Sequence, residues 1–242
     1  MNQDSPTLDT PTLVLWKQLR SDIEHIAYAH PDAVFASSMA AEDMLVFHAL
    51  ALYAPTLNTF SLNTGRLHAE TVAMAARIRE HYQRELIFYH PNPERVQAHV
   101  KQHGLYAFYD SVQLRKECCQ IRKVEPLRQA LQGHSAWITG QRREQSQSRT
   151  TLPKQEYDQT FGLEKFNPLA DWTHEQVWSV IHGLRIPYNA LHDQGYPSIG
   201  CEPCTRAIKP GEDVRAGRWW WEQRDTLECG LHASNLPSTA HT

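Results

Sequence analysis

Residues 33–53 read AVFASSMAAEDMLVFHALALY, and this stretch decides the fold class. Its first four residues form a short apolar run of the kind found in buried strands. A polar loop, Ser37–Asp43, follows, and apolar residues then continue to Tyr53 over the length of a helix. The stretch therefore predicts a strand, a loop and a helix in that order, which is the repeating unit of a parallel sheet.

The same unit recurs along the chain. Residues 57–62 are predicted as a second strand, Asn63–Arg66 as its turn and residues 67–81 as its helix. Beyond Pro187, glycine and proline interrupt every periodic pattern, which indicates mostly loop. We therefore expect an α/β fold, a parallel twisted sheet flanked by helices with a loop-rich C-terminal tail. Further strands are expected at residues 86–89 and 136–139, and further helices at residues 13–29, 93–102, 121–131 and 173–182, the last begun by a capping box of Thr173 and Gln176.

The composition fits one main domain. The chain has 242 residues, of which 41% are hydrophobic, enough for a substantial core. Its net charge of -3 gives no sign of a nucleic-acid-binding surface, and no stretch has the length of a membrane span. Since the N-terminal residues lack a secretory pattern, we expect a cytoplasmic protein that binds neither nucleic acid nor membrane. We expect an α/β domain over residues 1–210 and a mobile segment over residues 211–242, and the sequence leaves a homo-oligomer open.

Three loops that follow predicted strands carry groups suited to an anion. Parallel strands end at one edge of their sheet, where N–H groups of helix N-termini face a bound phosphate or sulfate. Taken alone, each segment is explained by an ordinary turn or a solvated basic loop. Because there are three such loops, an anion-binding site becomes an equally good interpretation. The candidate residues are Ser37 and Ser38 after the first strand, Thr64, Gly65 and Arg66 after the second, and Gly140, Arg143 and Arg149 after the fourth.

Four of the five cysteines form two tight pairs, Cys118–Cys119 and the C-x-x-C of Cys201 and Cys204. Two such pairs suit a four-thiolate site for a [4Fe–4S] cluster or a structural zinc ion. Because adjacent cysteines project in different directions, holding one centre with both requires a strained or sharply turned backbone, which favours the bulkier cluster. A thioredoxin-like dithiol at the C-x-x-C is the rival interpretation, and it leaves the adjacent pair unexplained.

The fifth cysteine, Cys229, stands apart near the C-terminal end. A reactive thiol needs cations that stabilise its thiolate, and Arg215, Arg218 and His232 are candidates. The run Trp219–Trp221 alternatively indicates an anchor for the tail. The two roles are compatible, because an anchored flexible end can dock as a lid.

Four motifs of this chain resemble those of the assimilatory sulfonucleotide reductases, in particular the type that acts on adenylyl sulfate. The likeness extends over residues 33–235, and its pattern of four cysteines is highly specific. The motifs are KECCQIRK at residues 116–123, TGQRR at 139–143, GCEPCTR at 200–206 and ECGLH at 228–232.

The resemblance implies a fold of the ATP pyrophosphatase (adenine nucleotide alpha hydrolase-like) group. It implies that Cys229 attacks the sulfur of adenosine 5'-phosphosulfate, that AMP leaves, and that thioredoxin or a glutaredoxin releases sulfite from the cysteine S-sulfonate. It also implies a [4Fe–4S] cluster on the paired cysteines. Lys123 would be a catalytic residue that acts at the reacting groups, and His232 would lie beside the nucleophile as another catalytic residue. By motif position, Lys123, Arg215 and Arg218 would contact phosphate and sulfate, and Arg143 and Arg149 would lie in the arginine loop.

Two departures from the family pattern and three alternatives remain. Asn63 stands where the family usually has aspartate, and Ser37–Asp43 lacks the glycines and the lysine of pyrophosphatase loops, which argues against ATP hydrolysis. A reductase for the 3'-phosphorylated substrate (PAPS) usually lacks all four paired cysteines. A nucleotide-binding tRNA thiolase with an iron–sulfur cluster would need a glycine-rich loop and a basic RNA surface. A zinc-stabilised binding module would leave Cys229 dispensable.

Overall fold

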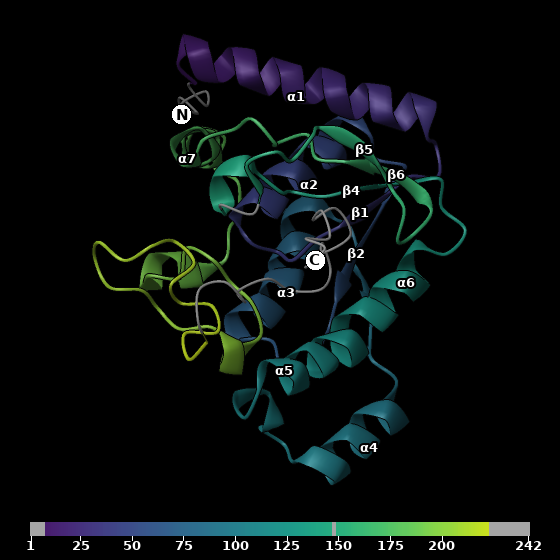
Figure 1. Ribbon diagram of the computed structural model, residues 1–242. Coiled ribbons are helices and arrows are strands. Elements are labelled where there is room, and N and C mark those ends of the chain that lie inside the picture. The colour runs from purple at the N-terminus through teal and green to yellow at the C-terminus, as the bar shows by residue number, and fades with distance from the viewer. Residues whose placement is uncertain (1–7, 147–148, 223–242) are drawn as a thin grey trace, which may run out of the picture.

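The computed structural model describes residues 8–146 and 149–222, which fold around a six-stranded sheet of order β3-β2-β1-β4-β6-β5 (Figure 1). β1, β2, β3, β4 and β6 run parallel, and β5 pairs with β6 in the antiparallel sense. The predicted mostly parallel α/β fold is therefore confirmed. The strands are β1 (Val34–Ala36), β2 (Asn58–Leu62), β3 (Ile87–Tyr89), β4 (Ala136–Ile138), β5 (Gln155–Asp158) and β6 (Leu163–Phe166).

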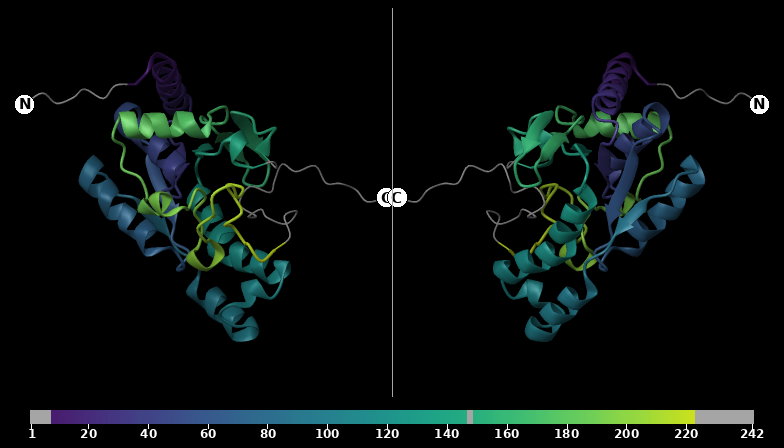
Figure 2. Two further views of the ribbon diagram at one scale, coloured as in Figure 1. Left: turned by 90° about the vertical axis from the view of Figure 1, so that its left-hand side faces the viewer. Right: turned by 90° about the vertical axis from the view of Figure 1, so that its right-hand side faces the viewer.

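Alternating side chains of the central strands supply a core on each face of the sheet. Phe35 and Ile138 belong to the larger core, together with side chains of α1, α2, α3 and α7. Val34 and Trp137, one residue earlier on each strand, belong to the core under α6. α1 forms an outer layer across α2 and α7 (Figures 1 and 2). The helices named here are α1 (Thr10–Ala29), α2 (Ala41–Tyr53), α3 (Ala69–Tyr82), α6 (Glu125–Leu131) and α7 (His174–Gly183).

Each helix predicted from periodicity is present, and the capping box at the start of α7 is confirmed. The Thr173 hydroxyl accepts from the Gln176 N–H at 3.2 Å, and the Gln176 side chain accepts from the Thr173 N–H at 2.8 Å. None of the helices within the described ranges has the length and apolar character that a membrane crossing requires.

The adjacent cysteines lie in a long helix that the sequence predicts only in its second half. α5 (Val112–Cys119) continues through a π-helical turn, Gln120–Val124, directly into α6. α4 (Pro93–His103) lies beside this composite helix (Figure 1). A π turn widens the helix and rotates the residues on either side of it, and such turns are frequent at functional sites.

The last described residues are fastened to α5 by buried charges. Arg115 is fully buried on α5 and makes two hydrogen bonds of 2.8 Å to the Glu222 carboxylate. The guanidinium groups of Arg115 and Arg218 each lie 4.6 Å from the ring centroid of Trp219, which is itself buried. The part of residues 211–242 up to Glu222 therefore packs against the helix that carries the adjacent cysteines, and residues 223–242 lie outside the described residues.

Removing one partner of this ion pair should cost much of the chain's stability. The Glu222 side chain is 3% exposed, so Glu222→Gln removes the carboxylate charge that faces the buried guanidinium, and we expect the free energy of unfolding to fall by about 3 kcal/mol. Glu24→Gln is the matched control, because the Arg20–Glu24 pair is 53% and 45% exposed and should contribute less than about 0.5 kcal/mol. Anaerobic urea titrations compare the two variants, and equal losses would contradict the role given to Glu222.

Candidate active site

A cavity of about 540 Å³ opens beyond the carboxyl ends of β1, β2 and β4. β1 lies between the other two strands, and the chain runs outward from it in both directions, so this is the switch point at which open α/β sheets bind ligands. One wall is apolar, with Phe60, Leu62, Leu127 and Trp137. The cavity brings together these predicted site residues: Ser37, Ser38, Thr64, Lys123, Gly140, Arg149, Arg215 and Arg218.

The loop after β1 uses part of its hydrogen-bonding capacity internally. The N–H and the hydroxyl of Ser38 both donate to Asp43 Oδ2 at 2.6 Å. The Ala41 N–H, at the start of α2, donates to Nε2 of His192 at 3.0 Å. An anion at this loop must therefore displace these partners or use other donors.

Asp43 also explains the glycine after β4. An ideal Cβ at Gly140 would overlap the Asp43 carboxylate and would stand 3.2 Å from the Asp43 backbone nitrogen. Burial raises the pKa of Asp43 to about 6, although hydrogen bonds from Ser38 and the Gly140 backbone lower it. A residue with no side chain at position 140 thus lets two loops of the cavity meet.

Residues of the turn after β2 line two different cavities. Gly65 has a φ of +70°, an angle that glycine adopts without steric cost, and Asn63 Oδ1 accepts from its N–H at 3.0 Å. Thr64 lines the large cavity. Arg66 instead lines a second, smaller cavity, with its guanidinium 4.9 Å from the Phe108 ring centroid.

All four paired cysteines line that smaller cavity. Cys118 and Cys119 come from the end of α5, and Cys201 and Cys204 from a short 3₁₀ turn and the bridge that joins Leu67 to Cys201. Arg66, Arg115, Arg122 and Lys123 surround the thiols with positive charge.

The four thiols are not gathered at the spacing of a single bound zinc ion. Among the described residues, no three of these thiols lie within 4.8 Å of one another. A tetrahedral zinc site would bring its sulfur atoms to roughly 3.8 Å of each other, given a Zn–S bond of about 2.3 Å. Burial raises the pKa of Cys118 above its usual range and that of Cys204 to about 12, so a metal centre that binds these two thiols has to displace their protons.

The backbone that presents the adjacent cysteines differs from expectation. Cys119 has ordinary helical angles, φ -65° and ψ -39°, where a strained or sharply turned backbone is predicted. The π turn that begins at Gln120 makes the adjustment instead. It also carries Lys123, which together with Cys201 lines both cavities.

Of the two arginines after Gly140, the second points away from the large cavity. Arg143 pairs with Asp171 and donates to the Leu152 carbonyl at 2.7 Å, and it does not line the cavity. Arg142 lines the cavity and is held by Glu42 at 2.8 Å. Sequence reasoning missed Arg142, because nothing in two adjacent arginines shows which one faces inward.

Two of the remaining predicted residues lie within the described part of the chain, and two lie beyond it. Arg218 is buried in the cavity wall, where it donates to the Ser198 hydroxyl at 3.3 Å and to the Ile199 carbonyl at 3.2 Å. Arg149 reaches the cavity from the loop after β4 and donates to Gln145 Oε1 at 2.7 Å. Cys229 and His232 lie outside the described residues.

Solved structures share the fold of this chain. The phosphoadenylyl-sulfate (PAPS) reductase of Candida auris, solved as a phosphate complex, matches with a TM-score of 0.65 and 25% identity over 84% of this chain and 98% of that one. The FMN adenylyltransferase of Candida glabrata, solved with an ATP analogue, matches with a TM-score of 0.56 and 14% identity over 95% and 80% of the two chains. The second likeness concerns the fold alone.

Curated proteins are much closer in sequence. The adenosine 5'-phosphosulfate reductase of Burkholderia cepacia is 54% identical over 98% of this chain and 95% of its own length. The protein of the same name from Allochromatium vinosum is 48% identical over 94% of this chain and 86% of its own. The model of the phosphoadenosine phosphosulfate reductase domain matches residues 32–207. Together with these bacterial proteins, the chain belongs to the phosphoadenosine phosphosulfate reductase family.

Proposed function

We propose that this protein reduces adenosine 5'-phosphosulfate to sulfite and AMP. The observation that carries the proposal is the 54% identity, over nearly the whole of both chains, with a protein named for that activity. The cavities support it, because a nucleotide-sized space with cationic side chains adjoins four convergent thiols. The 3'-phosphorylated substrate is the second candidate, since a PAPS reductase has the same fold at 25% identity.

The large cavity offers one apolar and one cationic region to such a substrate. Trp137 and Leu127 provide flat and aliphatic surface for the adenine base. Lys123, Arg215 and Arg218 provide the charge that the phosphate and sulfate groups require. Cations there also reduce the repulsion between an attacking thiolate and the sulfate.

Cys229 is the proposed nucleophile. Its thiolate attacks the sulfur of the sulfate group, an S–S bond forms, the bond from sulfur to the phosphate oxygen breaks, and AMP leaves with that oxygen. Cys229 lies seven residues after Glu222, a distance of at most about 25 Å in extended chain. Because Arg218 and Trp219 lie beside the two cavities, this length is sufficient for the thiol to reach bound substrate.

The second half-reaction needs an external dithiol, and we propose thioredoxin or a glutaredoxin. One thiolate of the partner attacks Cys229 and expels sulfite, and the partner's second thiol then displaces Cys229 as thiolate. Two electrons pass from the dithiol to sulfur, and the partner leaves as a disulfide. No metal has to change oxidation state in either step.

Cys118, Cys119, Cys201 and Cys204 would hold a [4Fe–4S] cluster. Bound there, it would supply a fixed charge distribution beside Lys123, which lines both cavities. The side chain of Lys123 lies on the π turn, so its position depends on the same helix that presents the adjacent thiols.

Labelled substrate tests the covalent step. Anaerobic protein mixed with sulfur-labelled adenosine 5'-phosphosulfate, without thioredoxin, should carry one label per chain on Cys229, because nothing is present to release it. Thioredoxin should then release the label as sulfite. Cys229→Ser is the control and should take up none, and the PAPS form is run in parallel. Equal labelling of the variant would exclude this nucleophile, and stronger labelling from PAPS would favour the second candidate.

Iron and acid-labile sulfide analysis tests the metal assignment. Wild-type protein and Cys229→Ser should each contain about four of both per chain, since Cys229 lies outside the proposed ligand set. Cys201→Ser should lose most of both, because three thiolates hold a cluster less firmly. Zinc without sulfide in the wild-type protein would establish a different centre.

The proposed role of Lys123 can be tested by comparing its substitution with that of Lys116, a lysine on the same composite helix. Lys123→Gln should lower kcat/KM by about 10²-fold or more, the usual effect of removing one charge-stabilising donor. Lys116→Gln should leave it unchanged, because Lys116 is exposed on α5 and lines neither cavity. Iron content is measured in both variants, and an unchanged kcat/KM in iron-replete Lys123→Gln would rule out this role.

A further inference from the structure

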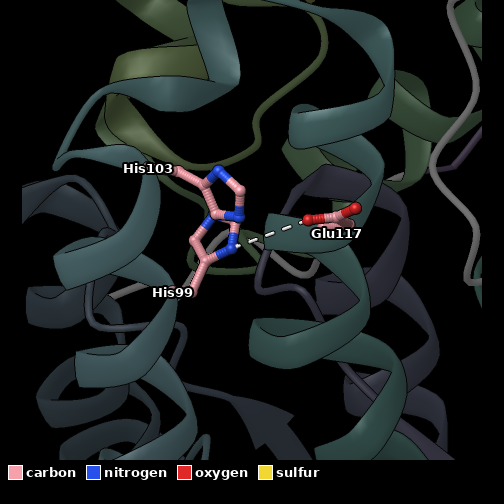
Figure 3. Close-up of side chains that lie close together, drawn as sticks. All are labelled: His99, His103 and Glu117. Carbon is pink, nitrogen blue, oxygen red and sulfur yellow. Dashed lines mark ion pairs between the residues drawn. The ribbon is translucent and has the colours of Figure 1, made fainter.

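Three potential metal ligands meet between α4 and α5, away from the substrate cavity. His99 and His103 project from α4 toward Glu117 of α5 (Figure 3). One ligand atom from each residue lies within 4.8 Å of the other two, and His99 Nδ1 stands 3.8 Å from Glu117 Oε2. The two imidazole ring centroids are 5.1 Å apart.

The arrangement has the features of a site for a transition-metal ion. Histidines four residues apart lie on the same face of a helix, so α4 presents both rings to one point. Two imidazoles and one carboxylate form a donor set that binds zinc and leaves a coordination position for water. The amide of Gln113 donates to Glu117 Oε1 at 3.1 Å, which orients the carboxylate as an outer-shell partner does.

A simple ion pair accounts for less of this arrangement. One histidine is sufficient to pair with Glu117, yet a second ring lies beside the first. The His99 side chain is only 11% exposed, so two imidazoles and a carboxylate are partly withdrawn from water at the same point. Partly buried polar groups of this kind are stabilised when they share a cation.

The packing of α4 adds an independent reason. No residue of this fully described helix is buried, so few apolar contacts fasten it over the composite helix. A metal ion bound by residues of both helices would add to the exposed ion pair between Arg95 of α4 and Glu125 of α6.

We propose that His99, His103 and Glu117 bind one zinc ion and so clamp α4 to α5. The site is separate from the thiol cavity. Glu117 precedes Cys118 by one residue, so its side chain leaves the helix about 100° around the axis from that cysteine. The clamp acts on the helix that bears two of the four paired cysteines.

Zinc binding to untagged, iron-replete protein under anaerobic conditions tests the proposal. Calorimetric titration with zinc chloride should give one site per chain, and X-ray absorption at the zinc edge should show nitrogen and oxygen neighbours only. His103→Ala and Glu117→Gln should each weaken binding at least tenfold. His25→Ala, which removes an exposed histidine of α1, should leave the affinity unchanged.

Hydrogen exchange gives a readout that does not depend on any variant. Zinc should slow amide exchange over Pro93–His103 in the wild-type protein and leave exchange in α1 unaltered. Absence of saturable binding, sulfur neighbours around the bound zinc, or full affinity in His103→Ala would each overturn the assignment.

Discussion

The contact of Trp219 with two buried guanidinium groups holds the two cavities and the C-terminal segment in one arrangement. Arg115 comes from α5 and Arg218 from the wall of the large cavity, and both lie 4.6 Å from the same ring. The Glu222 carboxylate, which follows Trp219–Trp221 in the chain, forms an ion pair with Arg115. A buried cation is costly to separate from its carboxylate, so moving the segment that leads to Cys229 away from α5 would break both hydrogen bonds between Arg115 and Glu222.

This arrangement concentrates positive charge locally in a chain whose net charge is -3. The thiol cavity and the large cavity together are lined by several arginines and by Lys123, but some of these cations are committed to structure. Arg142 is bound by Glu42, and Arg122 donates to the carbonyl of Thr64 at 2.7 Å. Tertiary structure therefore determines which of the basic residues contribute positive charge to an anionic ligand.

Much of the fold was predictable from the sequence, because local patterns determine it. Apolar runs identify the four parallel strands β1, β2, β3 and β4, and the Thr173 capping box identifies the start of α7. The β5–β6 hairpin was missed, since β5 has the sequence QEYD and three of its four side chains are not buried. α5 was missed because VQLRKECC has few apolar residues, and the two residues that it buries are Arg115 and Cys119. The π turn, and the inward choice of Arg142 over Arg143, depend on contacts distant in sequence that no local pattern encodes.

The Asp43 carboxylate has a consequence for the charge distribution in the large cavity. It lies beside the N-terminus of α2, where the helix dipole would otherwise attract a phosphate group. Burial raises its pKa to about 6, so it takes up a proton at a higher pH than an exposed aspartate does. In its ionised form it offsets the positive end of the α2 dipole inside the cavity, and the attraction for an anion is left to the cationic side chains of the wall.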